Sequence, residues 1–314
     1  MEQIKVLLLA CLIPGLAAGC RPPAAPPASL SRDWGAPRTF DYQGIKINYY
    51  EAGQGPPVLL LHGFGGCAYT WRYLIPPLAA AHRVLTLELK GYGLSDKPRD
   101  GHYAVADQAG MVAEFIRRQD LHDLVIMGHS MGGGVALMTF LKLQQDDPGR
   151  IIKLVLMDSA GYRQKLPWFI RLAKIPGANI LAALLPPRFA AALVLKKCYY
   201  HKDWITEEQV NTYAYYGSLP GAQEAISQTA RQIIPKDIDR LSKQYRDIKV
   251  PVLVIWGVED EVVPLRVALN FMRDLPNAQL VPLSYCGHIP PEEEPQATRQ
   301  AIMDFLKSNL RENY

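Results

Sequence analysis

Short runs of apolar residues recur along the chain and fall into two patterns. Six runs contain few polar residues, which is typical of strands buried on both faces of a parallel sheet. They occupy residues 57–61, 83–87, 124–127, 151–157, 252–256 and 279–283. Residues 39–50 instead alternate between apolar and polar positions about Gln43-Gly44, and this pattern predicts a β-hairpin.

Segments with helical spacing of apolar residues separate these predicted strands. They lie at residues 69–79, at 105–118, from 135 onward, and at 295–309. Strands that alternate with helices predict an α/β fold with a doubly wound, mainly parallel sheet.

Residues 161–235 interrupt this alternation. Their patterning is helical rather than strand-like, and they are rich in aromatic residues such as Trp168, Tyr199 and Tyr213. We therefore expect a helical cap here, inserted into an α/β core made of residues 36–160 and 236–314.

The first 20 residues have the organisation of a signal peptide. Lys5 precedes an apolar run too short to cross a bilayer comfortably, and residues 16–20 read Leu-Ala-Ala-Gly-Cys. This ending resembles a bacterial lipobox, which implies cleavage before Cys20 and lipidation of its thiol. The proline-rich residues 21–35 predict an extended tether. An exported protein, lipid-anchored at a bacterial outer membrane, is favoured; a soluble periplasmic or secreted protein is the alternative.

Composition narrows the possible functions. Hydrophobic residues make up 49% and charged residues 20% of the 314 positions, as in ordinary globular proteins. A net charge of +4 without a basic run does not indicate a nucleic-acid partner. No zinc-spaced cysteines are present, so we expect neither a metal nor a cofactor. Cys67, Cys198 and Cys286 leave open whether one disulfide forms, and the oligomeric state also stays open.

The strongest chemical signal follows the strand at residues 124–127. That strand runs into Gly128-His129-Ser130-Met131-Gly132, and a helical pattern comes next. Strand, sharp turn and helix are the context of a nucleophile elbow, in which a strained turn exposes the serine hydroxyl. We predict Ser130 as the nucleophile, with the N–H of Met131 at the helix start facing a developing oxyanion.

Two further residues complete the pattern in the required chain order. Asp260 and His288 each follow a late predicted strand, so both are expected at the carboxyl edge of the sheet beside Ser130. The order serine, aspartate, histidine is the one that α/β-hydrolases use. Asp158 also ends a strand and is an alternative acid, or else caps a turn, but Asp260 is the favoured acid.

Five segments together resemble the α/β-hydrolase superfamily over residues 38–310. They are His62-Gly-Phe-Gly-Gly66, Gly91-Tyr-Gly-Leu-Ser-Asp96, Gly128-His-Ser-Met-Gly-Gly133, residues 256–264 with Asp260, and Gly287-His288. The chain looks most like bacterial capped esterases and lipases. That resemblance implies carboxylic-ester hydrolysis, with the N–H groups of Phe64 and Met131 binding the oxyanion and His62 orienting the loop.

The resemblance and the residues together predict a serine hydrolase acting on short-to-medium acyl esters, with a small-molecule or lipid ester as substrate. Haloalkane dehalogenases and epoxide hydrolases of this fold need an aspartate where this chain has Ser130. Carbon–carbon bond hydrolases of meta-cleavage pathways keep the same three residues and remain the alternative reaction. An alternative of another class is a non-catalytic, membrane-tethered binding protein on a hydrolase fold. His129 and Cys286 are predicted to be structural, and Glu259 and Glu261 to be solvated.

Overall fold

A computed structural model describes residues 34–177 and 185–308 of the chain. The predicted signal peptide at residues 1–20, including Cys20, and nearly all of the predicted tether at 21–35 therefore lie outside the described residues. No helix in the described ranges is both long and apolar enough to span a membrane.

Eight strands form one sheet in the order β1-β2-β4-β3-β5-β6-β7-β8. β1 pairs antiparallel with β2, and β2 with β4, while all the other neighbours pair in parallel. The mainly parallel, doubly wound sheet and the hairpin are thus confirmed. The strands are β1 (Arg38–Tyr42), β2 (Ile45–Ala52), β3 (Pro57–Leu61), β4 (Arg83–Leu87), β5 (Leu124–His129), β6 (Ile151–Met157), β7 (Val252–Gly257) and β8 (Ala278–Leu283).

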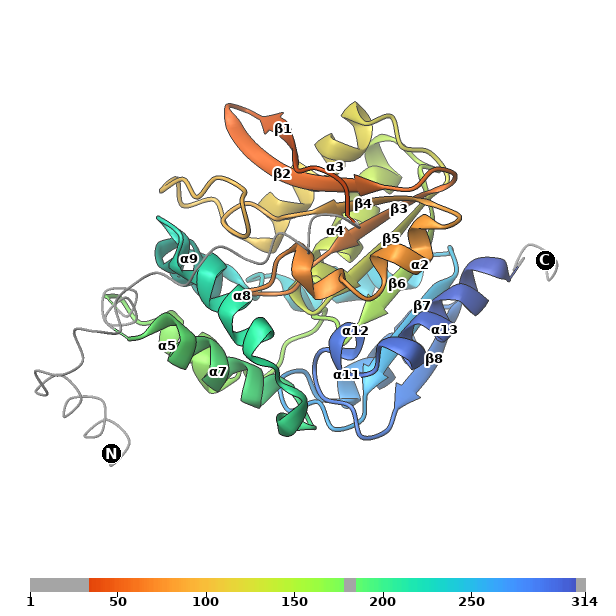
Figure 1. Ribbon diagram of the computed structural model, residues 1–314. Helices are drawn as coiled ribbons and strands as arrows, with labels where there is room; N and C mark the ends of the chain where they lie inside the picture. The colour runs from red at the N-terminus through yellow and green to blue at the C-terminus, as the bar shows by residue number, and fades with distance from the viewer. Residues whose placement is uncertain (1–33, 178–184, 309–314) are drawn as a thin grey trace, which may run out of the picture.

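Helices cover both faces of the sheet (Figure 1). Around the sheet lie α2 (Ile75–Ala79), α3 (Val105–Arg118), α4 (Met131–Asp146), α10 (Ile238–Leu241), α11 (Arg266–Asp274), α12 (Pro290–Glu293) and α13 (Pro295–Lys307). Short 3-10 turns are η4 (Ala68–Trp71), η5 (Lys202–Trp204) and η6 (Ser242–Asp247).

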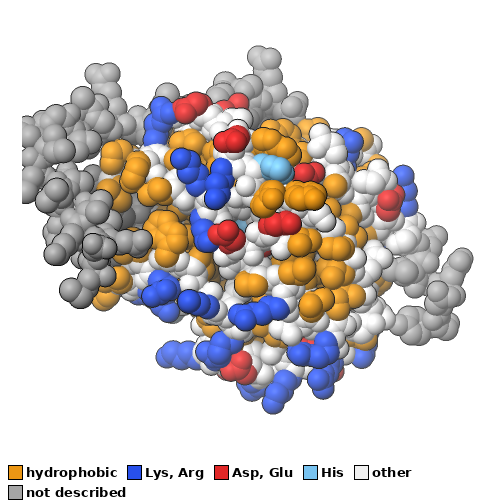
Figure 2. All heavy atoms as spheres, turned by 90° about the horizontal axis from the view of Figure 1, so that it is seen from below, with side chains coloured by type: hydrophobic (Ala, Val, Ile, Leu, Met, Phe, Trp, Pro, Cys, Tyr) orange, Lys and Arg blue, Asp and Glu red, His pale blue; other side chains and the backbone are white. Residues whose placement is uncertain are grey.

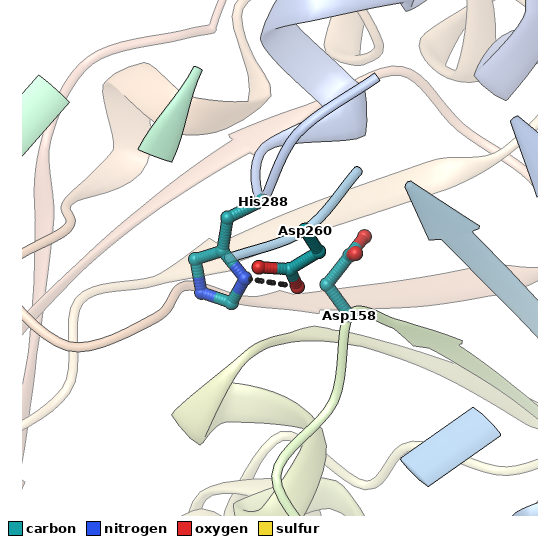
Figure 3. Close-up of side chains that lie close together, drawn as sticks. All are labelled: Asp158, Asp260 and His288. Carbon is teal, nitrogen blue, oxygen red and sulfur yellow. Dashed lines mark hydrogen bonds and ion pairs between the residues drawn. The ribbon is translucent and has the colours of Figure 1, made fainter. Parts of the chain in front are cut away.

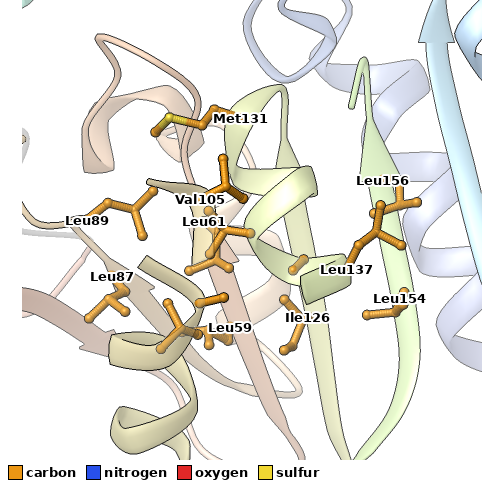
Figure 4. Packing of buried hydrophobic residues seen from close by; sticks show 14 of the residues in the cluster. Leu59, Leu61, Leu87, Leu89, Val105, Ile126, Met131, Leu137, Leu154 and Leu156 are labelled. Carbon is orange, nitrogen blue, oxygen red and sulfur yellow. The ribbon is translucent and has the colours of Figure 1, made fainter. Parts of the chain in front are cut away.

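The apolar strands have two buried faces, as their lack of alternation predicts. In β3, Leu59 and Leu61 belong to the hydrophobic cluster that includes α3 and α4, whereas Val58 and Leu60 belong to the cluster that includes α2 and α13. Figure 4 shows part of the first cluster, where Met131 at the start of α4 lies above the strand residues. The catalytic candidates therefore stand on a sheet packed from both sides, which holds its carboxyl edge rigid.

Two predicted helices differ in extent from those observed. The helix expected at residues 69–79 is divided into η4 and α2, because Pro76 and Pro77 lack an N–H and are tolerated only in the first turn of a helix. The helix after β5 begins at Met131 rather than at residue 135. Glycine has weak helix propensity, but Gly132 packs against the backbone of Leu61 and His62, and Gly133 packs against the Ser159 side chain, so tertiary contacts override it.

Between β6 and β7 the chain forms helices, and we refer to residues 161–235 as the cap. Its α-helices are α5 (Trp168–Ala173), α7 (Pro187–Cys198), α8 (Glu207–Ser218) and α9 (Ala222–Gln232), and they gather on one side of the molecule in Figure 1. Residues 178–184 of this segment lie outside the described ranges.

The face of the molecule drawn in Figure 2 mixes hydrophobic with basic and acidic side chains, and many of the lysines and arginines on this face lie toward one edge.

Candidate active site

Ser130 sits on the sharp turn between β5 and α4. Its backbone has φ 53° and ψ −120°, in the positive-φ region that non-glycine residues rarely adopt. Neighbouring backbone holds this strain in place, since the Ser130 N–H donates to the carbonyl of Met157 at 2.9 Å, and the N–H of Ala160 donates to the Ser130 carbonyl at 2.9 Å. The turn is therefore a strained strand-to-helix elbow of the kind that exposes a nucleophile.

The glycines that flank Ser130 are required by close backbone contact. A Cβ on Gly128 would lie 2.5 Å from the carbonyl oxygen of Gly132, and a Cβ on Gly132 would lie 2.2 Å from that of Leu61. Real Cβ atoms do not approach backbone so closely, so β5, α4 and the end of β3 can meet only with glycine at these positions.

The structure brings the three predicted residues together in one chain of hydrogen bonds. His288 Nε2 lies 2.9 Å from Ser130 Oγ, and His288 Nδ1 lies 2.7 Å from Asp260 Oδ2. With the Nδ1–H donating to the carboxylate, Nε2 is left to accept the hydroxyl proton of Ser130. All three side chains are buried, Ser130 being 9% exposed.

The Asp260 side chain is held in place by its own turn. Its Oδ1 accepts the N–H of Val262 at 2.7 Å and of Val263 at 3.0 Å, while Oδ2 faces His288. Three donors on one carboxyl group fix its orientation toward His288. Of the two candidate acids, Asp260 is therefore the one that contacts the histidine.

The predicted oxyanion donors lie on both sides of Ser130. Met131 is the first residue of α4, and Phe64 follows β3 in a loop that passes directly against the nucleophile, because a Cβ on Gly63 would lie 2.9 Å from that of Ser130. Within the described part of the chain, neither the N–H of Phe64 nor that of Met131 donates to a protein acceptor. Both groups are available to an incoming oxygen.

His62 fixes this loop, in line with the prediction. Its Nε2 accepts the N–H of Leu89 at 3.0 Å, so Nδ1 carries the proton that is donated to the carbonyl of Gly63 at 2.8 Å. Burial lowers the pKa of His62 to about 4, which keeps the ring neutral near pH 7. A ring with both nitrogens engaged orients the backbone and is not a free base.

His129 contacts the site more closely than the sequence suggested. We expected it to point away from the nucleophile in a structural role, but its Nε2–H donates to the carbonyl of His288 at 2.7 Å, and the two rings lie 4.9 Å apart. Burial, and next the neighbouring His288, lower the pKa of His129 to about 3. It is a neutral support of the His288 backbone.

Residues on either side of His288 tie this loop to the rest of the molecule. The His288 N–H donates to the carbonyl of Cys198 at the end of α7, at 2.6 Å. Glu293 accepts the N–H of Gly287 at 2.7 Å and that of His201 at 2.6 Å. Glu259, predicted to be solvated, instead accepts the N–H of Cys286 at 3.1 Å. The loop is thus held by the cap and by acidic side chains.

A buried ion pair within the core lies near this loop and receives hydrogen bonds from the cap. Glu292, in α12, pairs with Arg72 at 2.8 Å, and both side chains are less than a tenth exposed. Burial alone would lower the pKa of Arg72, but the charge of Glu292 offsets this and the pKa is raised. Glu292 also accepts hydrogen bonds from Tyr199, Gln209 and Tyr213 of the cap.

Sequence reasoning missed this network and the nearness of Asp158 to Asp260. The run of three glutamates at residues 292–294, directly after the histidine loop, was the available signal for the first. Cys286, predicted to be structural, is a free buried thiol, as are Cys67 and Cys198, so the disulfide that the sequence left open does not form among the described cysteines.

A narrow cavity opens onto Ser130 between the core and both ends of the cap. It measures about 50 Å³, counted as the space open to the centres of water-sized spheres. Its walls are mostly apolar and contain no charged side chain among the described residues. They include Val105, Met131, Met138, Leu166, Ile170, Ile233, Ile238 and Val262, with Gln164, Tyr162 and Tyr245 as polar members.

Comparison with known proteins agrees with this fold. The family described as alpha/beta hydrolase fold matches residues 56–295. An uncharacterized hydrolase of Bacillus subtilis (strain 168) is 30% identical over 275 residues, covering 86% of this chain and 97% of that one. The 2-hydroxy-6-oxo-2,4-heptadienoate hydrolase of Pseudomonas putida is 26% identical over 269 residues, covering 84% and 93%. A solved structure of the meta-cleavage product hydrolase CumD is 26% identical, with a TM-score of 0.73 over 87% of this chain and 98% of that one.

Proposed function

The chain belongs to the α/β-hydrolase family, and from that premise we propose that it is a serine hydrolase that cleaves carboxylic esters of short-to-medium acyl chains. Hydrolase activity is supported by the fold and by the relatives. The observation that carries the ester proposal is the narrow, apolar cavity that opens onto Ser130, whose walls contain no charged side chain among the described residues. Such a cavity suits a neutral acyl chain.

The reaction follows from the contacts of the three side chains. Ser130 Oγ attacks the acyl carbonyl carbon while His288 Nε2 takes its proton, and Asp260 stabilises the resulting imidazolium. The carbonyl oxygen becomes an oxyanion facing the N–H groups of Met131 and Phe64. His288 then protonates the departing alcohol, which leaves the acyl group on Ser130.

Water completes the cycle by the same route. His288 removes a proton from a water molecule, which attacks the acyl carbon and forms the second tetrahedral intermediate. Its collapse expels Ser130 Oγ, which regains its proton from His288, and the carboxylic acid departs. Removal of one oxyanion donor in sites of this kind typically slows the reaction about 10²–10³-fold.

A second candidate is hydrolysis of a carbon–carbon bond, which the relatives favour. The curated Pseudomonas relative is named for a dienoate and the CumD structure for meta-cleavage products. A dienoate carries a carboxylate, and a buried carboxylate needs a cation or several donors. Among the described residues that line the cavity none is a lysine, arginine or histidine, which favours the neutral ester over the dienoate.

One pair of measurements tests the proposal. The purified protein is assayed with p-nitrophenyl butanoate and with a 2-hydroxy-6-oxo-dienoate, and a fluorophosphonate reports whether Ser130 is reactive. We expect labelling that is lost in Ser130→Ala, together with ester turnover. Turnover of the dienoate alone would identify a carbon–carbon hydrolase, and absence of both labelling and turnover would favour the non-catalytic binding protein.

We also propose that Cys20 is lipidated and anchors the protein at a bacterial outer membrane. The lipobox-like residues 16–20 and the proline-rich segment after them support this. In cell fractionation, the native chain should sediment with outer membranes, and Cys20→Ser should leave it soluble or unprocessed. Mass spectrometry that finds a mature N-terminal cysteine with a free thiol would refute the lipidation.

A further inference from the structure

Asp158 is a second buried acid beside the proposed catalytic residues. It directly follows β6, has a φ of 43° and is fully buried. One carboxyl oxygen of Asp158, one of Asp260 and one ring nitrogen of His288 lie within 4.8 Å of one another. Figure 3 shows these three side chains side by side. The reaction described above uses only Asp260 and His288, which leaves Asp158 without a role.

The two carboxyl groups differ in how many donors they receive. Asp260 receives two backbone N–H groups and His288 Nδ1–H. Asp158 receives a single N–H, from Gly257 to Oδ1 at 3.0 Å, and its buried Oδ2 accepts no hydrogen bond from any described residue. A carboxylate oxygen buried without a donor is costly, whereas a protonated oxygen can itself donate.

The charges around Asp158 also oppose its ionisation. The ionisable groups facing it are Asp260 from the turn after β7, Cys286 and His288 from the loop after β8, and Glu293 from α12. Burial, and next the charge of Asp260, raise the pKa of Asp158 well above its usual range. Two carboxylates this close in a buried site do not both ionise.

We propose that Asp158 and Asp260 share one negative charge, with the proton on Asp158 while Asp260 is intact. Asp158 is then a charge reserve, a neutral acid that ionises only when Asp260 loses its charge. This inference rests on the proposed function and concerns an acid that lies beside its site. If Asp260 is made neutral, the repulsion disappears and Asp158 ionises in its place. A charged acid then still lies within 4.8 Å of His288.

A structural role predicts a different result. If Asp158 only accepts the N–H of Gly257 and so fixes its turn, asparagine should replace it fully, whether or not Asp260 is also substituted. As a charge reserve, it would be replaceable by asparagine in the native protein, where it is neutral, but not in Asp260→Asn, where it must carry the charge. The two roles are therefore separated by comparing the effect of Asp158→Asn in the native protein with its effect in Asp260→Asn.

The rate of Ser130 labelling by a fluorophosphonate tests this without assuming a substrate. The native protein is compared with Asp158→Asn, with Asp260→Asn and with the double variant. A matched control combines Asp260→Asn with Asp41→Asn, because Asp41 likewise accepts one backbone N–H, from Gly44, in the distant β1–β2 hairpin. Thermal melting checks the folding of each variant.

We expect Asp158→Asn to label within about threefold of the native rate, since a neutral amide preserves both the acceptor and a donor. Asp260→Asn should lose less than the roughly 10⁴-fold typical of a triad without its acid, and the double variant should lose at least tenfold more than Asp260→Asn. The control with Asp41→Asn should match Asp260→Asn alone. Equal rates for Asp260→Asn and the double variant with Asp158→Asn would overturn the charge reserve.

An absence of labelling in the native protein would instead contradict the proposed function, and this inference with it. A second measurement does not depend on activity or on the stability of the Asp260 variant. The difference infrared spectrum between the native protein and Asp158→Asn at neutral pH should contain the carbonyl band of a neutral carboxylic acid. A spectrum with only carboxylate bands would show that Asp158 is ionised and the inference wrong.

Discussion

The length of the acyl chain that the cavity accepts can be predicted from its volume. A water-sized group occupies about 10–15 Å³ on this measure, so 50 Å³ holds about three to five such groups. Beyond the carbonyl carbon this corresponds to butanoate to hexanoate. Each buried methylene contributes about 0.8 kcal/mol, so kcat/KM should rise up to about fourfold per carbon until the cavity is full and then fall.

Removal of one wall residue should shift this optimum. Met138 lies in α4, whose backbone is fixed by packing against β5 and β6, and it is only partly buried, so loss of its side chain should leave the fold intact. Met138→Ala removes three heavy atoms beyond Cβ. We therefore expect the optimum to move two to three carbons toward longer chains, with kcat/KM for acetate little changed.

A p-nitrophenyl ester series from acetate to palmitate measures both expectations. Leu269→Ala is the matched control, because Leu269 is 56% exposed on α11 and does not line the cavity. A monotonic fall of kcat/KM from acetate in the native protein would show that the aromatic cap residues leave only a small slot. An optimum that does not move in Met138→Ala would show that acyl chains do not bind in this cavity.

Three further predictions concern the triad, the buried ion pair and the second acid. Ser130→Ala should abolish nearly all hydrolase activity, and adding His288→Ala should reduce the remaining rate little further, because the triad residues act as a unit. A large further drop in the single-turnover rate of the double variant would contradict this. Glu292→Gln leaves the Arg72 cation buried without its partner, so it should lower the free energy of unfolding by about 3–5 kcal/mol in urea denaturation. The control Glu208→Gln, on the exposed face of α8, should change this free energy by about 0.5 kcal/mol or less. Equal effects of the two variants would refute a role for the ion pair in stability. The raised pKa of Asp158 means that the folded state retains a proton that the unfolded state releases above about pH 4, so the native protein loses stability as the pH rises. Relative to the native protein, Asp158→Asn should therefore gain up to about 1.4 kcal/mol in free energy of unfolding for each pH unit above that point. A stability difference between the two proteins that does not vary with pH would contradict this prediction.

Local sequence was sufficient for the sheet because the relevant signals act over short distances. The apolar runs that predict β3, β5, β6 and β7 have no polar alternation, and only a strand covered on both faces can bury them. Ser130 could likewise be found locally, because an elbow requires glycine at fixed offsets where backbones meet. Asp260 and His288 were found from chain order, since the carboxyl ends of parallel strands share one edge.

Contacts between distant segments could not be predicted in the same way. Asp158 and Asp260 are about a hundred residues apart, and only the pairing of β6 with β7 brings their turns together. The pair of Glu292 with Arg72 joins two core segments that are distant in the sequence, and the bond from His288 to Cys198 depends on how the cap packs on the core.

The sequence by itself therefore determined which residues stand at the carboxyl edge of the sheet, because strand periodicity and glycine sterics are properties of a few neighbouring residues. Only the tertiary structure decided which acid contacts His288, which acid is buried beside it with a single donor, and that the cavity is narrow, with no charged side chain among the described residues of its walls. Those properties depend on burial and on the distances between side chains from different elements, and no local pattern of residues specifies them.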